Sequence, residues 1–341
     1  MDFKRTLLAA TLVALSSAAH ALEIKFADIH PAGYPTVVAE ENMGKALTKQ
    51  SNGELTFKYF PGGVLGSEKE VVEQAQVGAI QMTRVSLGIV GPVVPDVNVF
   101  NLPFVFRDQA HMRKVIDGPI GDEILAKITD SEFGLVALAW MDGGTRNIYT
   151  KKPVRKIEDL KGMKIRVQGN PLFIEAFNEM GANGIAMDTG EIFSALQTGV
   201  IDGAENNPPT LLEHNHFQNA KYYTLTEHLI LPEPIVMSKI TWNKLTQRAV
   251  QTLVIRLTGD AKAADGPGLA AVRKDPQQII SQRRVDRHAE HQQQDRADQQ
   301  DDGQVAAIPQ FRRRPGAGWP CRPTAGSAGA TWPSPGSPSA R

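Results

Sequence analysis

Two separate runs of alternating strand-like and helix-like segments constrain the fold of this chain more than any other feature of its sequence. The first run has strand patterns at residues 23–27, 55–60 and 79–86, and helical patterns at residues 37–50 and 68–77. Strands that alternate with helices at this spacing predict a mostly parallel sheet covered by helices. The first 90 residues therefore predict one α/β layer structure.

A second run begins near residue 133 and predicts a second α/β half. It has strand patterns at residues 135–141, 146–150 and 163–167, and helical patterns at residues 171–180 and 191–198. Residues 220–231 then lead the chain back toward the first half. Because single cores stop growing at roughly 250–300 residues, 341 residues predict more than one lobe. We expect a bilobal α/β protein with two mixed sheets, flanking helices and a ligand cleft between the lobes.

The N-terminus has the pattern of a secretory signal peptide. Lys4 and Arg5 precede an apolar run at residues 7–15, and Ala19-His20-Ala21 places small residues around a cleavage position. The run is far shorter than the roughly 20 residues that span a bilayer. We therefore interpret residues 1–21 as a cleaved signal peptide and place the mature protein in the periplasm. A buried N-terminal helix is the alternative.

Charge, cysteine usage and motifs exclude several classes of function. The 37 basic and 37 acidic residues give a formal net charge of zero, so nothing points to nucleic acid or an anionic membrane surface. Cys321 is the only cysteine, which argues against a disulfide framework or a Cys-rich metal site. His214 and His216 are two residues apart on an expected helix and would not share a face. Nucleotide-binding glycine motifs and a nucleophile elbow are absent. We expect neither a metal nor a cofactor.

Four segments occur in an order and spacing that resemble one protein family. They are residues 60–66 (FPGGVLG), 100–104 (FNLPF), 158–167 (EDLKGMKIRV) and 193–208 (FSALQTGVIDGAENNP). From about Leu22 to about Leu245 the chain is similar to the solute-binding receptors of bacterial TRAP-type transporters, the DctP-like family. The resemblance implies a periplasmic-binding-protein-like fold whose two α/β lobes close on a ligand.

The resemblance also implies three ligand-binding residues in the second half. It implies that Arg166 forms a paired salt bridge with a ligand carboxylate, since a planar guanidinium offers two parallel N–H donors. It implies that Arg146 helps to hold the carboxylate or a nearby hydroxyl. Asn206 matches an asparagine that can donate and accept hydrogen bonds at once. The alternatives are structural ion pairs for the two arginines and a turn role for Asn206.

The first half is expected to supply the rest of the polar lining. Glu68 matches an acidic position that contacts ligand hydroxyls in this family. The other candidates for the cleft, each with a solvated or capping role as its alternative, are His30, Arg84, Ser86, Asn170 and Glu233. At Ser86 the family's sialic acid receptors carry an acidic residue, and this departure argues against that ligand.

Several polar groups around a carboxylate site favour a hydroxylated acid, such as a uronate or an aldonate, over a keto acid or a C4-dicarboxylate. An uncharged sugar would leave buried arginines unpaired. We predict a periplasmic receptor, not an enzyme, that delivers a small organic acid to a TRAP-type permease without itself spanning the membrane. A ligand-sensing module for a membrane receptor, and a hydrolase or lyase acting on a small acid, are the alternatives.

The expected domain boundaries place residues 22–143 and about 229–246 in lobe I and residues 144–228 in lobe II. Residues 247–341 are expected to form a tail without family-like sequence. They include a Gln/Arg/Asp-rich stretch at residues 277–304 and a Pro/Gly/Ser-rich end at residues 309–341. Such composition buries too little apolar surface to offset the entropy of ordering, so we expect disorder. Our hypothesis is a shift of reading frame near residues 246–260, and a genuine disordered extension is the alternative.

Overall fold

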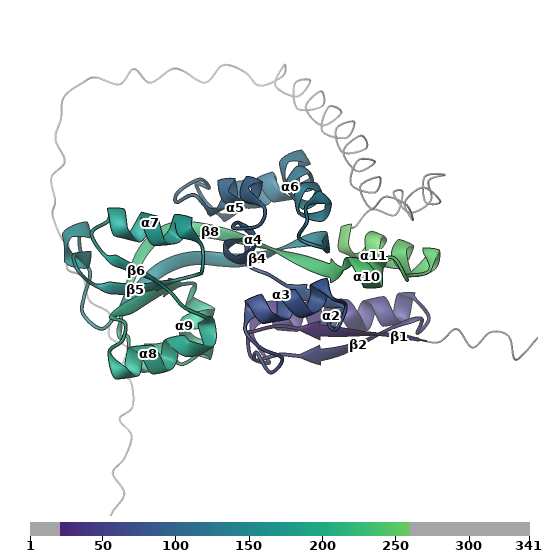
Figure 1. Cartoon of the computed structure of the whole chain (residues 1–341), viewed down its shortest axis with the longest axis horizontal. Helices are drawn as coiled ribbons and strands as arrows, with labels where there is room; N and C mark the ends of the chain where they lie inside the picture. The colour runs from purple at the N-terminus through teal and green to yellow at the C-terminus, as the bar shows by residue number, and fades with distance from the viewer. Residues whose placement is uncertain (1–20, 259–341) are drawn as a thin grey trace, which may run out of the picture. The chain divides into compact units, whose positions relative to one another are not determined.

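A computed structural model of the chain describes residues 21–258 (Figure 1). The expected signal peptide and the expected tail beyond residue 258, including the hypothesis of a shifted reading frame, lie outside the described residues. Within residues 21–258, no helix is both long and apolar enough to cross a membrane.

One mixed eight-stranded sheet organises the described residues, in the strand order β2-β1-β3-β8-β4-β7-β5-β6. Its strands are β1 (Leu22–Ala27), β2 (Leu55–Phe60), β3 (Met82–Arg84), β4 (Leu135–Thr150), β5 (Lys164–Val167), β6 (Asn183–Ala186), β7 (Gly203–Asn206) and β8 (Tyr222–Ser238). The pairings of β1 with β2 and β3, and of β5 with β6 and β7, are parallel. The pairings that involve β8, and that of β4 with β7, are antiparallel. We call β2, β1 and β3 the β1 end of the sheet, and β7, β5 and β6 the β5 end.

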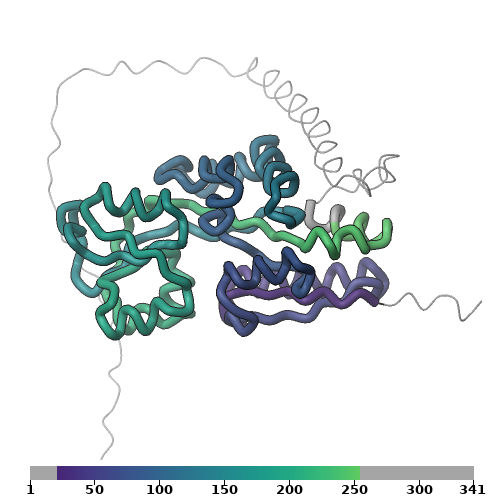
Figure 2. The backbone as a smooth tube through the Cα atoms, in the orientation of Figure 1, coloured from purple at the N-terminus to yellow at the C-terminus, as the bar shows by residue number. Residues whose placement is uncertain are grey.

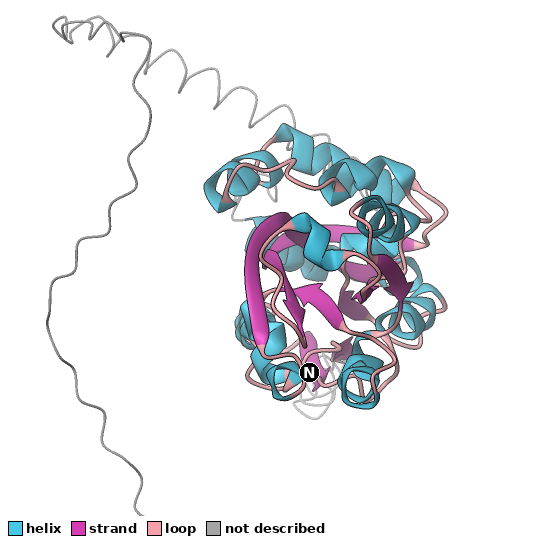
Figure 3. Ribbon diagram, turned by 90° about the vertical axis from the view of Figure 1, so that its left-hand side faces the viewer, coloured by secondary structure: helices cyan, strands magenta, loops and turns pink. Residues whose placement is uncertain are grey.

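Helices flank this sheet, as Figure 3 shows in a view turned by 90°. The α-helices are α2 (Pro35–Gln50), α3 (Glu68–Gln76), α4 (Leu87–Val90), α5 (Gln109–Ile116), α6 (Pro119–Asp130), α7 (Pro171–Glu179), α8 (Ile192–Thr198), α9 (Pro208–Glu213), α10 (Lys239–Trp242) and α11 (Gln247–Thr258). Short 3-10 helices are η2 (Pro95–Asn101), η3 (Ile157–Leu160), η4 (Thr189–Glu191) and η5 (His216–Gln218). The predicted α/β class is confirmed, and α5 and α6 occupy a stretch for which the sequence analysis made no prediction.

The expectation of two separate sheets is corrected by strands β4 and β8. These strands are 16 and 17 residues long and pair antiparallel along most of their length, so that one sheet continues from the β1 end to the β5 end (Figure 2). The sequence analysis split β4 at Gly143 and Gly144, where the pairing with β8 shifts register. A Cβ on Gly143 would lie 2.5 Å from the Leu231 carbonyl oxygen, and Gly144 has a φ of +77°. The two glycines therefore mark a bulge within a strand instead of a loop.

Helix α11 occupies residues 247–258, which the sequence analysis assigned to the start of the tail. Ala249, Val250 and Leu253 follow the spacing of one helix face. All three are buried, in an apolar cluster that also contains Leu47 of α2. The first turns of the expected tail are therefore helical and contribute to the core at the β1 end.

Two helix starts position polar residues that matter below. Helix α3 begins after Ser67, whose hydroxyl accepts from the Glu70 N–H while the Glu70 carboxylate accepts from the Ser67 N–H. This capping box satisfies two backbone donors. Helix α7 begins at Pro171 and is capped by Asn170, whose side-chain Oδ1 accepts a hydrogen bond from the Leu172 N–H. Each start is thus fixed locally by its own sequence.

Candidate functional site

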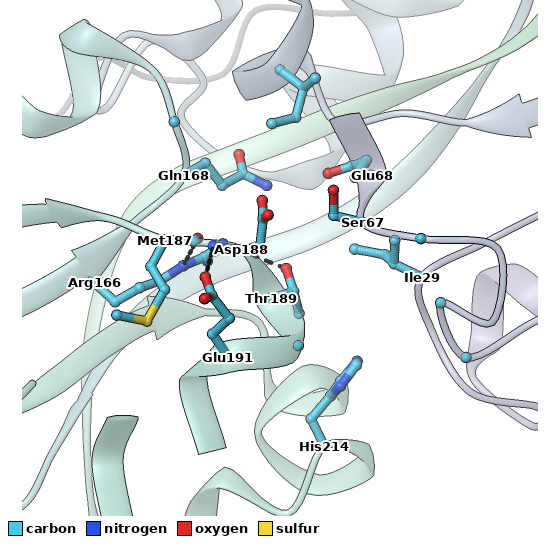
Figure 4. Close-up of a pocket in the computed structure, with 16 residues that line it drawn as sticks. Ile29, Ser67, Glu68, Arg166, Gln168, Met187, Asp188, Thr189, Glu191 and His214 are labelled. Carbon is cyan, nitrogen blue, oxygen red and sulfur yellow. Dashed lines mark hydrogen bonds between the residues drawn. The ribbon is translucent and has the colours of Figure 1, made fainter. Parts of the chain in front are cut away.

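A cavity of about 420 Å³ lies between residues from the two ends of the sheet (Figure 4). Its volume falls in the range of small-molecule sites, which is about 300–1,000 Å³. The β1 end contributes Ser67 and Glu68, together with glycines of the loop that precedes α3. The β5 end contributes Arg166 and Gln168, together with residues 187–191 and His214. The cavity is therefore lined by charged and hydrogen-bonding groups from both ends.

Arg166 is a buried cation without a carboxylate partner among residues 21–258. Its side chain is 2% exposed, and none of the ion pairs among the described residues includes it. Its Nε donates to the Met187 carbonyl at 2.8 Å and its Nη2 to the Thr189 hydroxyl at 3.4 Å, but Nη1 has no partner in the described part of the chain. Burial lowers the pKa of Arg166 from its usual value. An isolated buried charge costs several kcal/mol, so this site is suited to an anion.

Strand β5 holds Arg166 in this position. Ile165 and Val167 on either side of it are fully buried in the core of the β5 end, as alternation along a strand requires. Arg166 itself is paired with Ile185 of β6 and Ala204 of β7, so its backbone is fixed on both sides. The guanidinium therefore extends from a strand that is paired on both sides.

Glu68 lines the opposite side of the cavity at the start of α3. Its Oε1 accepts from the Ser86 N–H at 2.7 Å and from Arg84 Nη1 at 3.3 Å. Burial raises the pKa of Glu68 to about 7, and the nearby charge of Arg84 only partly opposes this effect. Near neutral pH this carboxyl can donate or accept a hydrogen bond, which suits a ligand hydroxyl.

Arg84 lies behind Glu68 as the centre of a buried ion network. It forms two hydrogen bonds with Asp28, at 2.8 and 3.0 Å, and its Nη1 lies 3.0 Å from Glu233 Oε2. Arg84 is 1% exposed, and neither Arg84 nor Glu233 lines the cavity. Their expected direct contact with a ligand stays a prediction, whereas Arg84 contacts the Glu68 carboxylate directly.

Arg146 is paired with a carboxylate, unlike Arg166. Its Nε and Nη2 donate to the two carboxylate oxygens of Glu205 at 2.6 and 2.7 Å, and its Nη1 donates to Asn206 Oδ1 at 3.0 Å. Burial alone would raise the pKa of Glu205, but the charge of Arg146 lowers it to about 2. Neither Arg146 nor Asn206 lines the cavity. This is the structural ion pair that the sequence analysis kept as its alternative, and a helper role for Arg146 stays a prediction.

The three remaining candidates connect elements around the cavity. Ser86 caps α4 by accepting from the Gly88 N–H, and Asn170 caps α7 and donates to Asn98 Oδ1. His30 Nδ1 lies 3.1 Å from His214 Nε2, and burial lowers the pKa of His30 well below its usual value. Of the nine candidate residues, Arg166 and Glu68 line the cavity itself.

The sequence analysis missed several lining residues. Gln168 could have been found, because a residue two positions after Arg166 lies on the same face of an extended strand. His214 and residues 187–191 lie in loops and short helices after other elements, where no local pattern indicates a direction toward the cavity. Among the described residues, no group of three or more His, Cys, Asp or Glu side chains is arranged to hold a metal ion.

A second cavity, of about 610 Å³, lies between α7 and strands β4 and β8. It is lined mainly by apolar side chains, including Phe173, Phe177 and Leu229. The carboxylate at this cavity, Glu205, is already paired with Arg146. Because this lining is mostly apolar and Glu205 is already paired, we take the first cavity, which contains the buried Arg166, as the candidate site.

His216, a buried residue near the site, is expected to make the folding stability depend on pH. It is 1% exposed and its Nδ1 lies 2.8 Å from the Tyr149 hydroxyl; burial lowers its pKa to about 3. The unfolded chain therefore takes up this proton first, and the stability that neutral His216 contributes is present above pH 6.5 and lost as the pH falls toward 3.

Below pH 6, we expect the free energy of unfolding of the wild type to fall by up to about 1.4 kcal/mol, relative to that of His216→Gln, for each unit by which the pH falls. Glutamine retains a hydrogen-bonding group but does not titrate. Urea unfolding of both proteins at pH 7.5, 6 and 5 measures this difference. A difference that stays constant across these three pH values would contradict the assignment.

Comparison with known proteins places the chain in a defined group. The model of the family described as "Bacterial extracellular solute-binding protein, family 7" matches residues 26–265, and thus runs past residue 246, where the sequence analysis ended the family-like region. A TRAP periplasmic solute binding protein from Pseudomonas putida F1, solved with bound D-glucuronate, is 65% identical with a TM-score of 0.68. That match covers 80% of this chain and 96% of the Pseudomonas chain.

Two further solved structures show the same similarity. A TRAP periplasmic solute binding protein from Citrobacter koseri with bound D-glucuronate is 50% identical, with a TM-score of 0.68, and the match covers 76% of this chain and 86% of that one. One from Bradyrhizobium sp. BTAi1 in complex with α/β-D-galacturonate is 44% identical, with a TM-score of 0.67 and coverages of 77% and 86%.

Proposed function

Because this chain belongs to family 7 of the bacterial extracellular solute-binding proteins, we propose that it binds a hexuronate, D-glucuronate or D-galacturonate, and delivers it to a TRAP-type membrane permease. The family consists of binding proteins, in agreement with the expectation that the chain is not an enzyme. The similar proteins from Pseudomonas putida and Citrobacter koseri hold D-glucuronate, and that from Bradyrhizobium holds galacturonate. These two sugars share a carboxylate on a hydroxylated ring.

The unpaired Arg166 carries this proposal. Of the three fully buried arginines described above, Arg84 and Arg146 are held by carboxylates of the chain itself. Arg166 borders the cavity, and its Nη1 has no hydrogen-bond partner within the part of the chain that the structure describes. A ligand carboxylate would supply the missing counter-charge and accept from two N–H groups at once. A neutral sugar would leave the buried cation uncompensated.

The polar groups across the cavity support a hydroxylated ring as the remainder of the ligand. Glu68, Ser67 and Gln168 face the same space as Arg166 (Figure 4). Each can hydrogen-bond a hydroxyl, and a carboxyl such as Glu68 can do so as donor or acceptor. A C4-dicarboxylate would instead bring a second negative charge toward Glu68, which is unfavourable once Glu68 ionises.

We propose that the ligand is captured when two lobes close on it. The lobes are those whose boundaries the sequence analysis predicted. The ligand contacts both ends of the sheet only in the closed arrangement, and this differential contact shifts the population toward closure. The closed form is then recognised by the permease in the bacterial periplasm. The names of the similar proteins, as TRAP periplasmic binding proteins, support this location and partner.

A thermal melt of the chain with a panel of ligands tests the proposed function. A ligand at 100 times its dissociation constant adds about 2.7 kcal/mol to the native state. D-glucuronate or D-galacturonate is expected to raise the melting temperature, whereas D-glucose, the uncharged counterpart of D-glucuronate, is not. A shift with succinate but not with either uronate would replace the proposal with a dicarboxylate receptor. The absence of any shift with the uronates would overturn it.

A further inference from the structure

Gln168 is a buried amide with a free donor that faces the cavity. It lies one residue past β5, is 6% exposed and lines the cavity on the same side as Arg166. Its Oε1 accepts from the Ser86 hydroxyl at 2.8 Å. Its amide nitrogen has no hydrogen bond to any residue that the structure describes, and Figure 4 shows the side chain directed to the space between Arg166 and Glu68.

Ser86 fixes which end of this amide faces the ligand. The Ser86 oxygen accepts from the Gly88 N–H at 3.3 Å as the cap of α4. The Ser86 hydroxyl donates its proton to Gln168 Oε1, so the NH₂ group of the amide is left for the cavity. The backbone N–H of Ser86 meanwhile donates to Glu68. One residue at the β1 end thus orients a polar group on each side of the cavity.

Gly88 leaves room for the Gln168 side chain. A Cβ at position 88 would lie 2.1 Å from Gln168 Oε1 and 2.8 Å from a ring carbon of Phe173. Both distances are shorter than side-chain atoms tolerate, so a larger residue at position 88 would displace Gln168. Gly88 thus leaves the space, and Ser86 supplies the hydrogen bond, that together position the Gln168 amide.

We propose that Gln168 is a ligand-contacting residue whose NH₂ group donates to a hydroxyl of the sugar ring, and that Ser86 is its positioning residue. Residues two apart in extended chain are about 6.6 Å apart. With the ligand carboxylate held at Arg166, we expect the ring to lie next to Gln168. This inference rests on the proposed function, because it takes a uronate as the ligand.

Titration calorimetry with D-glucuronate on substituted proteins tests the inference. Gln168→Ala is expected to weaken binding about 5- to 20-fold, the loss of one hydrogen bond in a buried site. Gln168→Glu, which has the same shape, replaces the donor with an acceptor-only carboxylate and is expected to weaken binding about 100-fold. Gln197→Glu makes the same change on the exposed face of α8 and is expected to bind like the wild type.

A double-mutant cycle separates positioning from general stability. Ser86→Ala is expected to weaken binding about 3- to 10-fold alone, and to have no further effect in the Gln168→Ala background, because Ser86 acts through Gln168. A purely structural role would lower the melting temperature without this non-additivity in the dissociation constant.

The outcomes distinguish this inference from the proposed function. If the wild type binds D-glucuronate and Arg166→Met abolishes binding, but Gln168→Glu binds like Gln197→Glu, the role of Gln168 is overturned and the proposed function stands. If the wild type binds no uronate, both are overturned. Should Gln168→Ala fail to fold, the isosteric Gln168→Glu still decides the question.

Discussion

Arg166→Met is expected to lose at least about 100-fold in affinity for D-glucuronate without losing stability in the absence of ligand. The variant removes a buried cation that has no carboxylate partner among the described residues, so it also removes an electrostatic penalty on the ligand-free fold. Methionine fills much of the same volume. In the bound state the ligand carboxylate would be buried without a counter-charge, which costs about 3–5 kcal/mol.

Calorimetry and urea unfolding measure the two effects separately. Arg166→Lys is the matched control: it retains the charge but offers no fork of parallel donors, so its affinity is expected to lie between those of the wild type and Arg166→Met. A large loss of ligand-free stability in Arg166→Met would show that the guanidinium is a structural element and would contradict our account of the site.

The same substitution at Arg84 is expected to have the opposite phenotype. Arg84→Met would leave Asp28, Glu68 and Glu233 buried without their shared counter-ion. Removing one partner of a buried ion network destabilises by about 3–5 kcal/mol. Arg113→Met is the control, because Arg113 pairs with Asp142 while its side chain is 46% exposed, and exposed pairs contribute at most about 1 kcal/mol.

This loss should depend on pH in a defined direction. In the wild type, burial raises the pKa of Asp28, but Arg84 outweighs burial and lowers it to about 2, so its contribution is present above pH 4 and lost as the pH falls through 2. Without Arg84, burial would raise the pKa values of all three carboxyls above their unfolded values. The stability of Arg84→Met therefore falls as the pH rises.

Urea unfolding at pH 4.5 and pH 8 provides the test. The deficit of Arg84→Met relative to the wild type is expected to be smaller at pH 4.5, where the orphaned carboxyls can be protonated. An equal deficit at both pH values would show that lost packing, and not uncompensated charge, accounts for the effect.

Local patterns in the sequence were sufficient for the fold class and for many of its elements. Periodicity predicted β1, β2 and α3 within a few residues, because each is defined by its own apolar spacing and its own turn or cap. The predicted strands at residues 135–141 and 146–150 left Gly143 and Gly144 outside both, since only the pairing of β4 with β8 shows that one strand continues through them. For the same reason the single sheet was not foreseen.

The candidate site, like the fold, was predicted from the sequence only in part. The sequence, with its resemblance to a family, indicated Arg166, and Gln168 was accessible from strand alternation. Only the tertiary structure decided which buried arginine lacks a carboxylate partner among the described residues, because Asp28 lies 56 residues from Arg84 and Glu205 lies 59 residues from Arg146. Residue type and local pattern are the same for a paired and an unpaired arginine. The free charge that makes this cavity an anion site is therefore a property of long-range packing.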